Sequence, residues 1–80
     1  MFEQKLILNN LDDIKRIVEI AKSMDYDIEL ISDKFTVDAK SITSVFTLDF
    51  TKPITIRAHC ENNGNLIKQI YPYVSKQGKK

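Results

Sequence analysis

The sequence is poor in the residues on which most catalytic and metal sites depend. It contains one cysteine, one histidine, two glycines and two prolines among 80 residues, and it has no tryptophan. The single cysteine, Cys60, excludes an internal disulfide and a thiolate metal cluster, and it agrees with a reducing compartment. No glycine-rich phosphate loop is present. We therefore expect a protein that is not an enzyme and that uses neither a metal nor a cofactor.

Long hydrophobic runs are also absent. No apolar run approaches the roughly 18 residues that a membrane span requires. The first residues, MFEQKLILNN, lack the charged and then apolar order of a secretory signal. A hydrophobic share of 42% and a charged share of 29% are those of an ordinary globular domain. We expect one small cytoplasmic domain that does not bind membranes.

The two charge signs are distributed unevenly along the chain. Residues 1–51 carry six basic and ten acidic side chains, whereas residues 52–80 carry six basic and one acidic. The positive excess is spread thinly or lies in the final KQGKK. A dense basic stripe, or basic residues interleaved with aromatic ones, would indicate nucleic-acid binding, and neither is present. We expect no nucleic-acid partner.

Apolar periodicity predicts seven short elements, because the pattern alternates between a two-residue and a helical repeat. The strands are expected around residues 6–8, and at 26–31, 34–37 and 53–60. The helices are expected at about residues 11–24, at 42–49 and from residue 66, with Pro72 ending or kinking the last one. Only two residues, Ser32 and Asp33, separate the second and third strands, which predicts a tight hairpin.

Each predicted helix carries one apolar stripe and each strand one apolar face, so the elements can bury these surfaces in two layers. The first helix illustrates the stripe, formed by Ile14, Ile17, Val18 and Ala21. The predicted fold is α+β: a four-stranded, mainly antiparallel sheet in the order βαββαβα, with three helices on one face. The opposite face of the sheet should be open to water.

The few chemically versatile side chains do not form a recognisable site. His59 and Cys60 are adjacent in a predicted strand, so their side chains point to opposite faces and cannot form a metal pair. We expect His59 on the solvated face without a base beside it, and Cys60 as a small core residue. Asp25 and Asp27 lack the alternating spacing of a calcium loop and are expected to be solvated.

Two segments resemble a known family. VDAKSITSVFTL (37–48) resembles the region around the regulatory serine of HPr, the histidine-containing phosphocarrier of the bacterial sugar phosphotransferase system. AKSMDYDIEL (21–30) is similar to the join between the first helix and second strand of that family. The resemblance implies an HPr-like open-faced β-sandwich over residues 1–76, with a shortened hairpin at 31–35, and we expect a flexible tail at 77–80.

The sequence departs from this family at its active site. HPr proteins carry a His-x-Arg-Pro signature between the first strand and the first helix, and the gapless register places Asn10 at the histidine. Asp12 and Asp13 stand where arginine and proline belong. Asn10 followed by Asp13 three positions later is instead typical of a helix cap. We therefore predict a divergent member that accepts no phosphoryl group here.

Ser41 allows two readings. Its hydroxyl can cap the second helix by accepting a bond from a backbone amide near Thr43 or Ser44, and it can also be phosphorylated, as the resemblance implies. The resemblance further implies that the surrounding helix docks a partner protein. The candidate contact residues are Lys40, Ile42, Thr43, Val45 and Phe46. Thr43 and Ser44 replace the hydrophobic residue and glycine usual in the family, which weakens recognition by its kinase.

Three functions follow from these observations. The first is a non-catalytic HPr-like binding or regulatory module whose partner belongs to the phosphotransferase system or to a regulatory pathway. The second is a phosphocarrier of that system with an unrecognised acceptor, and the third is a small-ligand sensor domain. The sequence leaves the oligomeric state open.

Overall fold

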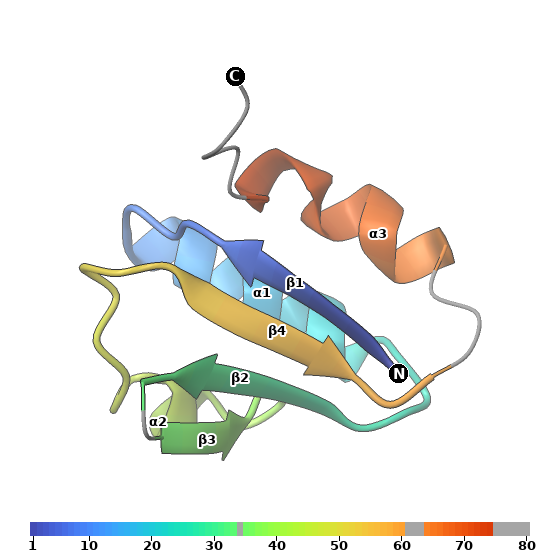
Figure 1. Ribbon diagram of the computed structural model, residues 1–80, viewed down its shortest axis with the longest axis horizontal. Helices are drawn as coiled ribbons and strands as arrows, with labels where there is room; N and C mark the ends of the chain where they lie inside the picture. The colour runs from blue at the N-terminus through green and yellow to red at the C-terminus, as the bar shows by residue number, and fades with distance from the viewer. Residues whose placement is uncertain (34, 61–63, 75–80) are drawn as a thin grey trace.

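The computed structural model describes residues 1–33, 35–60 and 64–74. The predicted tail at 77–80 lies outside them, so the limits of the domain stay a prediction. The chain forms two layers, with the helices packed on one face of a single sheet (Figure 1). The elements are β1 (Phe2–Leu6), α1 (Leu11–Lys22), β2 (Ile28–Ser32), β3 (Phe35–Asp38), α2 (Ile42–Val45), β4 (Ile54–Ala58), α3 (Gly64–Ile70) and the short 3₁₀ helix η1 (Tyr71–Tyr73).

The sheet is antiparallel throughout, with strand order β1-β4-β2-β3. β4 lies in the interior, where Ile54 is opposite Leu6 of β1 and Ile56 is opposite Leu30 of β2. These four side chains are almost completely buried and face the helices. The predicted α+β class, element order and arrangement of helices on one face are confirmed.

Helix α1 buries the stripe that its sequence predicts. Ile14, Ile17, Val18 and Ala21 all lie in the core, since residues spaced by three and four share one side of a helix. The helix ends at Lys22 rather than at residue 24, where the bonding tightens: the Met24 N–H bonds only three residues back, to Ala21, and the Ser23 hydroxyl donates to the Ile20 carbonyl at 2.7 Å.

The first strand lies earlier than the sequence predicts, at Phe2–Leu6 rather than around residues 6–8. Its pairing with β4 stops at Leu6 and Ile54, and the residue just before β4 is Pro53, which has no N–H to donate. Beyond this point the Ile7 N–H bonds to the Tyr73 carbonyl at 2.7 Å. Leu8 is still buried although it belongs to no strand.

The other differences concern short elements. α2 has only four residues, and α3 begins at Gly64, two residues before its predicted start. α3 ends at Ile70, where Pro72 is accommodated in η1, and Val74 then forms an isolated bridge with Leu6 instead of continuing a helix. The predicted β2–β3 hairpin is confirmed, with Ser32 opposite Phe35.

The face of the sheet opposite the helices is polar, as predicted. Glu3, Glu29 and Arg57 project from three neighbouring strands and are partly or largely exposed. No helix in the described part of the chain is long and apolar enough to cross a membrane.

Candidate functional site

Asn10 closes the N-terminus of α1. Its backbone is extended (φ −151°, ψ 175°), and its Oδ1 accepts a bond from the Asp13 N–H at 2.9 Å. Asp13 Oδ2 in turn accepts a bond from the Asn9 N–H at 3.0 Å. The predicted cap is therefore confirmed, although the reciprocal bond reaches Asn9 rather than Asn10. Two backbone amides at this corner already have acceptors, and Asp12 and Asp13 add negative charge in the first turn.

Ser41 precedes α2 but does not cap it through its side chain, so the sequence prediction is wrong on this point. Its Oγ lies 3.3 Å from Thr43 Oγ1 and donates to Ser44 Oγ at 3.2 Å. These three hydroxyls satisfy one another instead of bonding backbone amides. Ser41 contributes its carbonyl to the helix, where it accepts the Val45 N–H at 3.0 Å. Because α2 is only one turn long, its dipole adds little to binding an anion.

The remaining candidates around α2 differ in accessibility. Val45 is fully buried in the core, whereas Phe46 is 46% exposed and Thr43 is exposed. Ile42 is partly buried and packs against the core. Lys40 is partly buried, and its Nζ donates to the Met24 carbonyl at 3.0 Å. Among these candidates, Thr43 and Phe46 are exposed and Ile42 and Lys40 are partly exposed, so these four offer side-chain surface near α2.

The structure does not bring Asn10 and Ser41 together. Lys40, next to Ser41, contacts Met24 just beyond the C-terminus of α1, whereas Asn10 lies at the N-terminus of that helix. A helix of 12 residues is about 18 Å long. The corner at Asn10 and the hydroxyl cluster at Ser41 are therefore separate surfaces.

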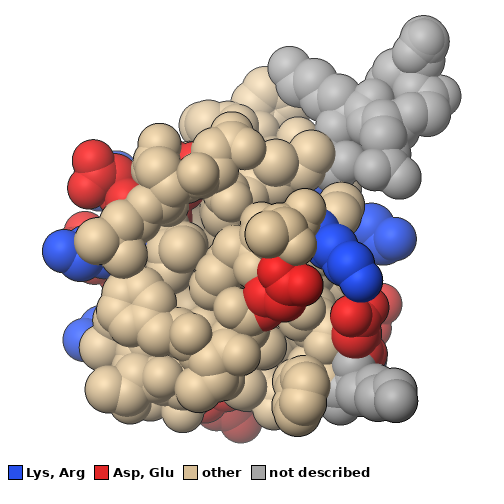
Figure 2. Space-filling view, turned by 90° about the vertical axis from the view of Figure 1, so that its left-hand side faces the viewer, with Lys and Arg blue, Asp and Glu red and all other residues tan. Residues whose placement is uncertain are grey.

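Uncharged side chains form much of the end of the molecule at which β1 leads into α1 (Figure 2). Ile7 and Leu11 lie in this connection and are 41% and 52% exposed. The hydrophobic pattern of the sequence did not single them out, because both stand beside residues of the predicted core. Two exposed apolar side chains therefore lie next to the start of α1.

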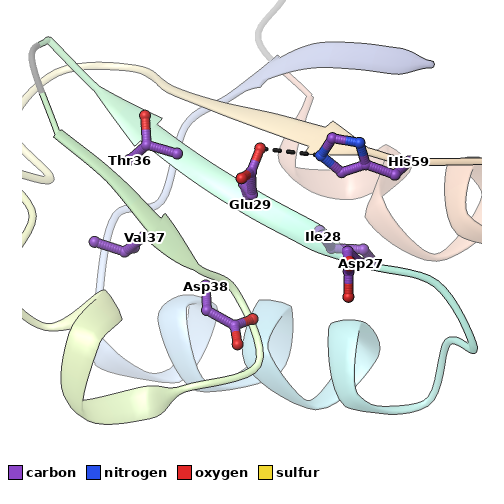
Figure 3. A pocket seen from close by; sticks show the side chains of 7 residues that line it. All are labelled: Asp27, Ile28, Glu29, Thr36, Val37, Asp38 and His59. Atoms are coloured by element: carbon purple, nitrogen blue, oxygen red, sulfur yellow. Dashed lines mark hydrogen bonds and ion pairs between the residues drawn. The ribbon is translucent and has the colours of Figure 1, made fainter.

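His59 lies on the open face, as predicted, but one residue beyond the end of β4. Its N–H bonds to the Asp27 carbonyl at 2.9 Å, which continues the pairing with the chain before β2. The expectation that no base lies beside it is wrong, since His59 Nε2 is 3.1 Å from Glu29 Oε1 (Figure 3). The sequence signal for this contact was the alternation of polar residues on two strands, but it becomes visible only with the register of β2 against β4.

Arg57 extends this polar group across the sheet. Its Nε donates to Glu3 Oε2 at 2.7 Å, and its Nη1 is 3.5 Å from Glu29 Oε1. The hydrogen bond that Arg57 donates to Glu3 is the main cause that raises the pKa of Arg57 above its usual value. Arg57 and His59 therefore share the carboxylate of Glu29, and the row Glu3, Arg57, Glu29 and His59 contains two acids for one permanent cation.

A hollow that the sequence did not predict lies beside this row. It has a volume of about 420 Å³ and opens on the uncovered face of the sheet near β3 (Figure 3). Its lining residues are Asp27, Ile28, Glu29, Thr36, Val37, Asp38 and His59. Three of them are acidic. Within residues 1–33, 35–60 and 64–74, no group of three histidine, cysteine, aspartate or glutamate residues is arranged to hold a metal ion.

Cys60 is partly buried and packs against the core beside Tyr26. Burial and then the hydrogen bond with the Cys60 thiol raise the pKa of Tyr26 above its usual value. This contact gives the thiol a structural role at the edge of the core, close to the one expected from the sequence.

Comparison with known proteins gives the fold a name. No family model matches the sequence, and no curated protein sequence matches it significantly. The structure is similar to the crystal structure of HPr-C-His from Thermoanaerobacter tengcongensis, with a TM-score of 0.74 and 20% sequence identity. The similarity covers 90% of this chain and 89% of the other. The chain therefore has the HPr-like fold, an α+β open-faced sandwich.

Proposed function

We propose that this protein is a non-catalytic HPr-like module, which binds a partner protein and lacks the phosphoryl-accepting histidine of the phosphocarriers. The observation that carries this proposal is the corner at Asn10, which the sequence resemblance aligns with that histidine. An amide side chain stands there, and it is engaged in capping α1 through the Asp13 N–H.

The electrostatics of this corner support the proposal. A phosphoryl group at a helix start is stabilised by free backbone N–H groups and by the positive end of the dipole. Here Asn10 and Asp13 occupy the amides of Asp13 and Asn9, and the carboxylate of Asp12 lies in the same turn. A transferred phosphoryl group would meet this negative charge, and it would find two of the amide donors near the corner already engaged.

The other possible acceptor, His59, has similarly unsuitable surroundings. It lies at the open face of the sheet, and the nearest charged group is the carboxylate of Glu29 at 3.1 Å. A phosphoryl group added to its ring would be repelled by this acid. The alternative of a phosphocarrier with an unrecognised acceptor therefore finds no support at His59.

A phosphotransfer assay tests this part of the proposal. The protein is incubated with enzyme I of the phosphotransferase system and labelled phosphoenolpyruvate, with a histidine-containing HPr as the positive control. We expect label on the control and none on this chain. Acid-labile phosphate on Asn10 or His59 would contradict the proposal and support a phosphocarrier.

We place the protein-binding surface at α2, where Phe46 and Thr43 are exposed and Ile42 is partly exposed. A partner protein is first recovered by affinity purification. Phe46→Asp should lower the affinity for this partner about ten-fold, because an aromatic anchor in an interface contributes more than about 1 kcal/mol. Ile67→Asp is the matched control, since Ile67 is 38% exposed and lies on α3. Equal losses for both variants would refute the assignment to α2.

We further propose that phosphorylation of Ser41 regulates this surface. A phosphate there would replace a hydroxyl that contacts Thr43 and Ser44, and it would place charge one residue before Ile42. Incubation with an HPr kinase and ATP should add one phosphate to the protein and none to Ser41→Ala. An unchanged mass for both proteins would exclude regulation by such a kinase, while the pull-down would still test binding at α2.

A further inference from the structure

The two edges of the sheet differ in what covers them. At the β1 edge, the segment after α3 contacts the chain through the bond from the Ile7 N–H to the Tyr73 carbonyl and through the bridge between Leu6 and Val74. At the other edge, β3 pairs with β2 and, among the described residues, with no strand on its outer side. An edge strand of this kind presents backbone N–H and C=O groups that can pair with an added strand.

β3 is short, at four residues, and it ends in Asp38, whose carbonyl accepts the Ser41 N–H at 3.0 Å, but it lacks the other features by which edge strands usually avoid such pairing. Its sequence, FTVD, contains neither proline nor lysine. Its register with β2 runs from Ser32 opposite Phe35 to Glu29 opposite Asp38 without a bulge. Phe35 is 66% exposed, so an apolar side chain stands beside the open edge.

The hollow next to β3 adds a charge preference. Asp27, Glu29 and Asp38 line it, and neither lysine nor arginine does. Arg57, which approaches Glu29, is already bonded to Glu3 at 2.7 Å. A positively charged side chain entering from the β3 edge would therefore meet more carboxylates than cations.

We propose that β3 docks an extended segment of a partner protein, which adds as a fifth strand and carries lysine or arginine at alternate positions. Side chains alternate between the faces of a strand, so every second one would lie on the open face beside Thr36 and Asp38. Opposite residues of paired strands have their Cβ atoms about 5 Å apart, within reach of the Asp38 carboxylate for a lysine. The intervening side chains would cover Phe35. This proposal concerns the β3 edge rather than α2, and it does not depend on the α2 surface proposed above.

Amide NMR spectra of the full-length protein test the proposal directly. The probe is the acetylated and amidated peptide TKVKVKT, and the matched control is TEVEVET. We expect saturable shifts with the lysine peptide at residues 35–38 and 27–29, and none with the glutamate peptide. Asp38→Asn should weaken binding of the lysine peptide about three-fold, as for a partly exposed ion pair. It preserves Oδ1, which accepts the Lys40 N–H at 2.9 Å.

Glu19→Gln is the control for the change in net charge, since Glu19 lies on α1 and is exposed. This variant should bind the lysine peptide as well as the original protein does. The proposal is overturned if the lysine peptide causes no saturable shift at millimolar concentration, if the shifts lie on another surface, or if both peptides act alike. Shifts at residues 35–38 that depend on protein concentration alone would also overturn it, because a second copy would then cover the edge.

Discussion

At the start of α1, one amide side chain determines how the first turn is satisfied. Asn10 Oδ1 accepts the Asp13 N–H, and Asp13 accepts the Asn9 N–H. Both bonds join residues close in sequence, so they form as soon as the turn forms. The Asn10 side chain also occupies one donor that an incoming anion could use, which links the stability of the helix to the absence of phosphotransfer proposed above.

The contribution of this cap can be measured. Asn10→Ala should lower the free energy of unfolding by about 1 kcal/mol, because it leaves the Asp13 N–H without its acceptor. Asn10→Asp should retain most of the stability, since its carboxylate accepts the same bond. Urea denaturation followed by circular dichroism provides both values. If Asn10→Ala and Asn10→Asp lost equal stability, the capping bond would not be the cause.

Among the elements, the β2–β3 hairpin depends on one unusual backbone conformation. Asp33 has a positive φ of 51°, which places it in the left-handed region that aspartate tolerates better than most residues other than glycine. Its carboxylate lies 3.6 Å from Lys52 Nζ, but both side chains are more than half exposed. A surface pair of this kind contributes little, so backbone preference should dominate the effect of a substitution.

This reasoning predicts opposite behaviour for two small residues at position 33. Asp33→Ala should destabilise the protein by about 1 kcal/mol, because alanine disfavours the left-handed conformation. Asp33→Gly should be close to neutral or slightly stabilising, since glycine adopts it without steric cost. Thermal unfolding of the two variants measures the difference. Equal losses for Asp33→Gly and Asp33→Ala would show that the ion pair with Lys52, which both variants remove, rather than φ, determines the stability of the turn.

Elements with a strong repeat were predictable, and those that depend on distant contacts were not. The stripe of α1 fixed its buried face, and the alternation around Ile54 and Ile56 fixed that of β4. The limits of β1 depended on Pro53, which lies far along the chain just before β4, and no local pattern at β1 indicates this. The side-chain bonds of Ser41 were missed because Thr43 and Ser44 offer hydroxyls that compete with the backbone amides.

The same distinction applies to the candidate sites. Asn10 was assigned to a cap from spacing alone, because both of its bonds are local. The pairing of His59 with Glu29 and the acidic hollow join residues from β2, from β3 and from the segment just after β4. Such a site exists only once the order β1-β4-β2-β3 is known, and the sequence predicted an antiparallel sheet without predicting that order.

For the whole molecule, the interior position of β4 makes its core side chains the most costly to truncate. Ile56 is 1% exposed and lies opposite both Gln4 of β1 and Leu30 of β2, so it packs where both halves of the sheet meet the helices.

A domain of this size has a total stability of about 4–12 kcal/mol. Ile56→Ala should remove about 2–5 kcal/mol through lost burial and the remaining cavity, whereas Ile56→Val should remove about 1 kcal/mol. Thr55→Ala, on the open face of the same strand, is the matched control and should cost less than about 1 kcal/mol. Chemical denaturation distinguishes these outcomes, and equal losses for Ile56→Ala and Thr55→Ala would mean that the two faces of β4 do not differ as the fold requires.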